Sequence, residues 1–340
     1  MRRMLPGLLP LVLCALGAAI PAGPAAAAQK VKLTMPVAAL SMTPVYLATT
    51  KGFFAEEGLD VAMTATGGGG PDIMALIAGQ ADFSFTTGDN VILASQEGKR
   101  LLIVMSGLHR LFINWAMHKE VAGARGIGET TPLPQKLKDL KGLNVGVTQL
   151  GALTSHLASF VIRKAGYVPH EDVKIVPIGS GPSWLAALEK RKVDVALTAP
   201  PVPETAISRG FAIMFLNNAR GEDPSVPEFL MENLVVRPEM AQKNPGLVRR
   251  MAHALVKANR WALAGTPEQV VEALQPLPFL GKTDPAILLA GVRSTLPTLN
   301  PDGRATERAV QVTQEVLQQA GILKRRIPYT ELISNEFLPK

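Results

Sequence analysis

Small hydroxyl side chains gather where predicted strands turn into predicted helices, and these residues are the best suited to chemistry in this sequence. Such turns place hydroxyl donors beside the free backbone N–H groups of a helix start, which suits the polar atoms of a buried ligand. The same hydroxyls could instead cap the helices, and residue types alone leave both interpretations open. The turns span residues 39–43, 66–70, 86–90, 149–155, 179–184 and 198–201. Candidate ligand-binding residues within them are Ser41, Thr66, Gly67, Thr86, Thr87, Thr154, Ser155, Ser180, Thr198 and Pro200.

Five larger or charged residues in or near these turns are further candidates. Tyr46 and Trp184 fall in the first turns of predicted helices, where either ring could stack on a planar ligand or pack in the core. Asp89 could accept a hydrogen bond from an amine or ring N–H, or it could cap a helix. Arg110 could pair with an anionic ligand or remain a solvated loop charge. Met42 completes the candidate set.

Catalytic and metal-binding motifs do not occur in the sequence. It contains no Gly-x-Ser-x-Gly elbow, no Walker loop and no His-Glu-x-x-His motif. The tetraglycine at 67–70 precedes a predicted helix but lacks the Lys and Ser/Thr of a phosphate-binding loop. The five histidines are scattered without metal-ligand spacing, and Cys14 is the single cysteine. We therefore expect no catalytic residues, no metal and no cofactor.

The composition is that of a globular protein with two lobes. The 340 residues are 47% hydrophobic and 19% charged, which is enough to bury a large core. No apolar run reaches the roughly 20 residues that a membrane-spanning helix needs. The formal net charge is +7, but the basic residues are scattered and 324–326 is the one obvious cluster. This distribution favours a solvated surface over a nucleic-acid partner.

The first residues have the order of a secretory signal peptide. Arg2 and Arg3 form a basic start, the apolar run 8–20 follows, and three alanines at 26–28 supply a small-residue cleavage site. The apolar run is too short to span a membrane. We therefore predict a signal peptide over 1–28 and a mature, cysteine-free chain that begins near Gln29 in the periplasm.

Predicted strands and helices alternate along two successive blocks, which indicates βαβ units and a parallel sheet in each. In the first block we expect a helix over 44–57 that Thr43 caps. Between the blocks, the Gly-, Pro- and Thr-rich segment 121–135 is predicted to be a surface excursion. The final third is predicted to be helical, with a capping box at 266–269. Predicted strands of the two blocks are 31–37, 59–64, 81–85, 101–106, 144–148, 173–177, 193–197 and 211–216.

Several segments resemble the periplasmic binding proteins of the nitrate/sulfonate/taurine and thiamine-pyrimidine-precursor class. The longest, over 44–61, contains PVYLA and KGFFAEEGLDV. Further segments follow in the order expected for that class: ALIAGQADF at 75–83, LKDLKG at 137–142, LEKRKVDVA at 188–196, and the ending 329–338. Within these segments Asp82 and Asp194 are expected to bond neighbouring backbone, and Gly58 to end a helix in the left-handed conformation.

The resemblance implies an α/β type II periplasmic-binding-protein (Venus-flytrap) fold with a two-crossover hinge. Lobe I would comprise 29–115 and 218–340, and lobe II would comprise 116–217. Ser41, Tyr46, Thr87, Thr154 and Thr198 would then approach one ligand from both lobes. The implied function is capture of a small, anionic or planar organic molecule for an ABC importer. Its partners would be the permease and ATPase subunits, and the protein would act as a monomer.

Two other functions remain open at this point. A ligand-sensing receptor subunit would use the same architecture to present its closed form to a signalling partner. A pyrimidine-synthase-like enzyme would also share the fold, but such enzymes rely on a cysteine-rich iron site. The mature chain is predicted to have no cysteine, which weighs against the enzyme.

Overall fold

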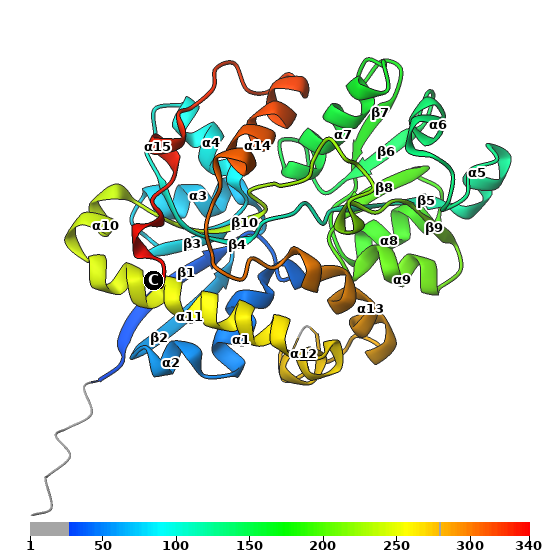
Figure 1. The fold of residues 1–340 in the computed structure, drawn as a ribbon. Coiled ribbons are helices and arrows are strands. Elements are labelled where there is room, and N and C mark those ends of the chain that lie inside the picture. Colours follow the sequence, from blue (N-terminus) through cyan, green and yellow to red (C-terminus); the bar gives the residue numbers. More distant parts are fainter. Residues whose placement is uncertain (1–26, 279) are drawn as a thin grey trace, which may run out of the picture.

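The structure is a computed structural model that describes residues 27–278 and 280–340. The predicted signal peptide, with Arg2, Arg3 and Cys14, therefore lies almost entirely outside the described residues. The described chain forms two α/β lobes, each built on one five-stranded sheet (Figure 1). We name them the first lobe, which contains β1, and the second lobe, which contains β6. No helix in the described ranges is long and apolar enough to cross a membrane.

The two sheets have the same strand order. The first sheet runs β2-β1-β3-β10-β4 and the second runs β7-β6-β8-β5-β9. The first comprises β1 (Gln29–Met35), β2 (Leu59–Ala65), β3 (Phe83–Thr86), β4 (Leu102–Leu108) and β10 (Glu232–Val236). The second comprises β5 (Asn114–His118), β6 (Asn144–Val147), β7 (Lys174–Pro177), β8 (Val195–Thr198) and β9 (Ala212–Leu216). This shared order confirms the predicted repeat of two similar blocks.

The repeat extends to individual residues. Leu33 pairs with Phe83 in the first sheet, and Val145 pairs with Val195 in the second. The Asp82 carboxylate accepts a hydrogen bond from the backbone N–H of Lys32 at 2.8 Å. The Asp194 carboxylate accepts one from the backbone N–H of Asn144, also at 2.8 Å. Both aspartates thus bond neighbouring backbone at equivalent positions, as predicted.

The chain crosses between the lobes twice, and this makes each sheet mixed rather than parallel. The first crossing joins β4 to β5 and the second joins β9 to β10. Each crossing strand enters the other lobe's sheet next to its edge strand, and β5 and β10 are antiparallel to both of their neighbours. The predicted all-parallel sheets were wrong on this point, because a strand that arrives from the opposite lobe runs against the βαβ strands.

The helix predicted over 44–57 is two helices. They are α1 (Thr43–Thr50) and α2 (Phe53–Glu56), separated at Gly52, which has φ of +78°. Only glycine adopts this left-handed conformation without strain, so the helical path breaks there. Thr43 does not cap α1, because it is the first helical residue and its hydroxyl donates to the carbonyl of Leu40 at 2.6 Å. Gly58 ends the unit in the left-handed conformation, as predicted.

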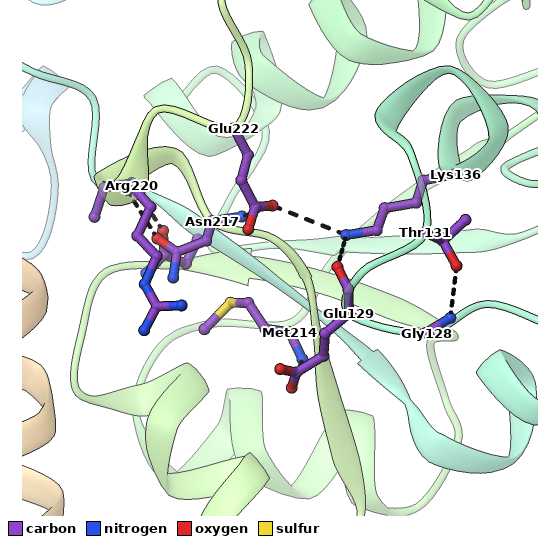
Figure 2. Close-up of polar contacts among 10 residues, drawn as sticks. Gly128, Glu129, Thr131, Lys136, Met214, Asn217, Arg220 and Glu222 are labelled. Carbon is purple, nitrogen blue, oxygen red and sulfur yellow. Dashed lines mark hydrogen bonds and ion pairs between the residues drawn. The ribbon is translucent and has the colours of Figure 1, made fainter.

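Segment 121–135 is more ordered than a surface excursion. It contains most of α5 (Lys119–Ala124) and the start of α6 (Leu133–Lys138). The buried Lys136 ammonium donates to the carbonyl of Glu129 at 2.8 Å and lies 3.8 Å from the Glu222 carboxylate (Figure 2). Burial lowers the pKa of Lys136, while both glutamates counteract that effect. This contact holds the segment against the chain that leaves β9.

The remaining helices surround the two sheets. The first lobe carries α3 (Gly69–Ile77), α4 (Gly88–Gln96), α10 (Pro238–Lys243), α11 (Pro245–Ala264), α12 (Pro267–Leu274), α14 (Glu307–Gln319) and α15 (Tyr329–Leu332). The second carries α5, α6, α7 (Leu153–Lys164), α8 (Pro182–Glu189) and α9 (Val202–Ser208). Helix α13 (Pro285–Thr295) lies against α9, and α14 lies against α7, so the C-terminal helices also contact the second lobe (Figure 1). The predicted capping box of Thr266 and Gln269 is present on α12.

Candidate functional site

A cleft of about 1110 Å³ lies between the two lobes. The first lobe contributes residues from 36–41, 65–70 and 87–90, and the second contributes residues from 148–154, 179–185 and 198–205. These segments include the turns that follow β1, β2, β3, β6, β7 and β8, where parallel strands end. Ligands of open α/β sheets bind at this end of the strands. The cleft is therefore the candidate functional site.

Nearly half of the residues predicted from sequence border this cleft. Ser41 comes from the turn after β1, Thr87 from the turn after β3, and Thr198 from the end of β8. The full set of predicted residues that line the cleft is Ser41, Gly67, Thr87, Thr154, Ser180, Thr198 and Pro200. The structure thus brings hydroxyl groups of both lobes to one cavity.

Tyr46, Trp184 and Met42 lie in the hydrophobic core rather than on the cleft wall. The Trp184 indole N–H donates to the carbonyl of Leu197 at 3.4 Å. Burial raises the pKa of the Tyr46 phenol, and its hydrogen bond to the backbone of Ala39 counteracts this. Because Ala39 lines the cleft, Tyr46 supports the cleft wall from behind.

Five other predicted residues also lie off the cleft lining. The Thr66 hydroxyl donates to the carbonyls of Met35 and Gly68, which closes the turn after β2. Arg110 is exposed on the first crossing. Buried residues in this group are Thr86, Asp89 and Ser155.

The cleft hydroxyls do not cap the helices that begin at the cleft. Thr87 precedes α4, but its hydroxyl accepts from the Asn90 side chain at 2.8 Å and makes no capping bond within the described chain. Thr154 lies inside α7 and its hydroxyl accepts from the backbone N–H of Thr148 at 3.1 Å. The first residues of α3 and α8 likewise receive no cap from any side chain that the structure describes. By contrast, α12 and α14, which begin elsewhere, are capped by Thr266 and Thr306, and α13, which begins at the cleft, is capped by Asp284.

Five α-helix starts, those of α3, α4, α7, α8 and α9, therefore border one cavity without a side-chain cap from the described residues. Their backbone N–H groups and positive dipole ends are available for hydrogen-bond acceptors of a ligand. The residue types left ligand binding and helix capping open as roles for these hydroxyl groups. Among the described residues, Thr87 and Thr154 do not cap a helix, so ligand binding is the interpretation that remains for them.

Glu232 is a cleft residue that the sequence analysis missed. It is the first residue of β10, lines the cleft, and is 3% exposed. Burial raises its pKa well above the ordinary range, hydrogen bonding by Ser41 counteracts this, and the nearby carboxylates of Asp72 and Asp89 raise it further. The one available signal is the pair of polar residues Glu232 and Asn233 between two apolar runs, 229–231 and 234–236, and neither run is among the predicted strands.

The basic residues that line the cleft lie at its rim. Arg209 and Lys282 are exposed, whereas Glu232 is buried on the floor. The amides of Asn90 and Gln149 add polar groups from opposite lobes, and neither was predicted. The arrangement can therefore hold a ligand through hydrogen bonds rather than through a buried cation.

Asp89 joins the lobes. Its carboxylate lies 3.1 Å from Nδ1 of His156, which is on α7 of the second lobe. The side chains are 0% and 4% exposed, so this contact is fully shielded from water. Asp89 was expected to face a ligand amine or to cap a helix, and its observed partner is instead a histidine of the opposite lobe.

A second, smaller cavity of about 410 Å³ occurs in the second lobe and shares no lining residue with the cleft. Met214, Asn217, Arg220 and the two glutamates beside Lys136 border it (Figure 2). Within the described ranges, no cluster of three or more His, Cys, Asp or Glu residues could hold a metal ion.

Curated relatives cover most of the chain at low identity. YtlA of Bacillus subtilis, which carries the name of a binding protein, is 20% identical over 92% of this chain and 89% of its own length. The riboflavin-binding protein RibY of Chloroflexus aurantiacus is 25% identical over 92% of this chain and 86% of its own length.

Solved structures share the fold. A protein from Bordetella bronchiseptica has a TM-score of 0.75 at 21% identity and covers 91% of this chain and 95% of its own. The periplasmic aliphatic sulphonate binding protein SsuA of Escherichia coli has a TM-score of 0.68 at 15% identity, with coverage of 90% and 92%. The desulfurization enzyme DSZB has a TM-score of 0.61 at 18% identity, with coverage of 91% and 97%.

These likenesses confirm the predicted periplasmic-binding-protein fold of two lobes joined by two crossings. The family model described as NMT1/THI5 like matches residues 40–269, which is more than half of the sequence. The chain belongs to the NMT1/THI5-like family.

Proposed function

We infer that this protein captures a small organic molecule in the cleft between its two lobes. The observation that carries the proposal is the cleft of about 1110 Å³, which is bordered by strand-to-helix turns of both lobes. Its volume is at the upper end of those that enclose small-molecule ligands. Ser41, Thr87, Thr154, Ser180 and Thr198 are the hydroxyl residues that we assign to the ligand.

Closure of the lobes would shield the bound molecule from water. The two crossings, 109–113 and 217–231, are the places where the chain can bend as a hinge. Expulsion of water strengthens each hydrogen bond between the cleft and its ligand. A ligand that contacts both lobes would therefore favour the closed arrangement.

Delivery to an ABC importer is the biological role that fits this capture. The predicted signal peptide directs the mature chain to the periplasm, and the name of SsuA describes a periplasmic binding protein. The partners would then be a membrane permease with its ATPase subunits, and the protein would act as a monomer. Binding without turnover distinguishes this role from the enzyme alternative. That alternative is tested because the enzyme DSZB has a similar fold.

The test is to purify the mature chain from the periplasm and to analyse it by native mass spectrometry. We expect a bound small molecule that leaves on denaturation, and a higher melting temperature when the molecule is added back, because a ligand of the folded state stabilises it. Recovery of the compound unchanged after prolonged incubation supports binding rather than catalysis. Chemical conversion of the compound, or a protein that binds no small molecule at all, would overturn the proposal.

The import role has a separate readout. Deletion of the gene should abolish uptake of the identified compound, and expression of the chain with its signal peptide should restore it. Unchanged uptake together with altered transcription in response to the compound would instead support the sensing alternative.

A further inference from the structure

We propose that Glu232 selects the ligand by accepting a hydrogen bond from an N–H or ammonium group, so that the cleft takes an N–H-bearing molecule and rejects simple anions. This inference rests on the proposed function and adds the chemical class of the ligand. Glu232 starts the strand that returns the chain to the first lobe, directly after the second crossing. Its position on the cleft floor places it between the lobes.

The hydrogen bonding of this carboxyl group is incomplete. Ser41, which also lines the cleft, bonds to it. Within the described chain, Oε2 of Glu232 is buried and has no hydrogen-bond partner. Buried polar atoms in folded proteins are nearly always paired, because an unpaired one loses its hydration without compensation. An unpaired carboxyl oxygen on the floor of a cavity therefore indicates that a donor of the ligand completes the site.

The charges around the cleft determine which donor is favoured. Asp72 and Asp89 both act on Glu232 as negative charges. The basic residues of the lining, Arg209 and Lys282, are exposed at the rim. A ligand N–H group can donate to this oxygen. A cationic amidinium or ammonium group would also favour the ionised form of Glu232, which burial alone disfavours, and would make a charge-assisted bond stronger than a bond between neutral groups.

The same charges disfavour an anion. A nitrate, sulfonate or carboxylate group on the floor would meet the carboxyl oxygen of Glu232, and the described lining offers no buried cation to compensate it. An anion beside Glu232 would also meet the like charge of Asp72 and Asp89. Helix starts at the cleft wall can still bind uncharged acceptors, such as the carbonyl oxygens of a heterocycle. A molecule with N–H donors and carbonyl acceptors on one planar ring satisfies both parts of the cleft.

Four fragments of nearly equal size provide the first test. Benzamidinium and benzamide present N–H groups, whereas benzoate and benzenesulfonate present anionic oxygens on the same ring. The wild-type protein is titrated with each fragment, and NMR signals of the fragment report binding. We expect benzamidinium to bind most tightly and benzamide next, and both anions to bind at least tenfold more weakly than benzamidinium. Tighter binding of either anion than of benzamidinium, or binding of neither N–H fragment, would overturn the inference.

Glu232→Gln tests the residue itself. We expect this variant to bind benzamidinium at least tenfold more weakly, because its amide keeps the size of the side chain but cannot ionise beside the cation as the carboxyl group can. Glu204→Gln is the matched control, since Glu204 is another glutamate with a burial-raised pKa that does not line the cleft. Equal affinity of wild type and Glu232→Gln for benzamidinium would overturn the assignment. The four-fragment comparison on the wild type decides the ligand class even where Glu232→Gln does not fold.

The co-purified compound provides an independent test. We expect its formula and spectrum to show at least one N–H group, and a compound without one overturns this inference while leaving the proposed function intact. A wild-type protein that carries no compound and binds nothing from any chemical class would instead overturn the proposed function.

Discussion

At the scale of single residues, Asp72 shows how burial alters the acid chemistry beneath the cleft. Its side chain lies in α3, is 0% exposed, and accepts a hydrogen bond of 2.5 Å from the Ser84 hydroxyl on β3. Burial raises its pKa to about 6, and hydrogen bonds from Ser84, Thr34 and Thr86 limit the rise. The protonated form is therefore favoured more in the folded chain than in the unfolded chain.

Asp72→Asn should flatten the dependence of folding stability on pH. Because the folded pKa is raised, the stability that Asp72 contributes is complete below about pH 3.8 and is lost as the pH rises through about 6. The difference amounts to about 3 kcal/mol at about 1.4 kcal/mol per pH unit. Urea unfolding at intervals from pH 4 to pH 7 measures it. An unchanged slope in the variant would show that another group is responsible.

Thr198 and Thr86 form a natural pair for testing the cleft hydroxyls. Each is the last residue of an equivalent strand, β8 or β3, but Thr198 lines the cleft and Thr86 does not. Thr198→Val should weaken binding of the co-purified ligand by about 1–3 kcal/mol, because a polar atom of the buried ligand loses its partner. Calorimetric titration measures the affinity. Thr86→Val should lower the melting temperature and leave affinity unchanged, and the reverse pattern would contradict our placement of the ligand.

At the scale of elements, the start of α3 shows how a glycine leaves room for a side chain of the opposite lobe. Gly68 precedes α3 with φ of 168°, an extended conformation that any residue can adopt. A Cβ atom at this position would lie 2.8 Å from Nε2 of Gln149, which belongs to the second lobe. Glycine here leaves room for the amide at the end of the flexible Gln149 side chain, and the backbone conformation does not require it.

Gly68→Val should weaken ligand binding while the folding stability changes little. The added side chain would displace the Gln149 amide, which lines the cleft, whereas the local backbone is free of strain. Gly70→Ala is the control, because Gly70 also lines the cleft but a Cβ there meets no described atom within 4 Å. Titration calorimetry and thermal melts measure both quantities. Equal affinities of Gly68→Val and Gly70→Ala would show that the position of the Gln149 amide does not affect ligand binding.

At the scale of the whole molecule, the two lobes are joined by more than the two crossings. Helices α13 and α14 of the C-terminal third contact α9 and α7 of the second lobe. The Asp89–His156 pair adds a buried polar contact between α4 and α7. The hinge therefore works against a defined set of contacts, and the balance between open and closed arrangements depends on them.

His156→Ala should destabilise the protein by about 3–5 kcal/mol, because Asp89 would remain buried without its partner. The double variant with Asp89→Asn should recover part of this loss, since it removes the uncompensated charge. Denaturant unfolding measures both. Arg191→Ala is the control: it breaks the exposed pair of Arg191 with Glu120 within the second lobe and should cost no more than about 1 kcal/mol. Equal costs for the two single variants would show that burial of the Asp89–His156 pair does not matter.

Much of the fold was predictable because its signals are local. The predicted strand over 59–64 is present as β2, and the capping box of α12 was readable from Thr266 and Gln269. The roles of Asp82 and Asp194 followed from a repeated motif. The antiparallel crossing strands were not predictable in this way, because their direction depends on the lobe from which the chain arrives.

The sequence by itself determined the α/β elements, the repeat of two blocks and the turns that border the cleft, because periodicity and turn chemistry act between near neighbours in the chain. Tertiary structure alone decided which of those turn residues line the cavity, that Trp184 lies in the core, and that Asp89 meets His156 across the lobes. It also decided that Glu232 lies on the cleft floor. These features arise when segments separated by tens to hundreds of residues pack together, and side-chain burial, which sets their chemistry, has no local signature in the sequence.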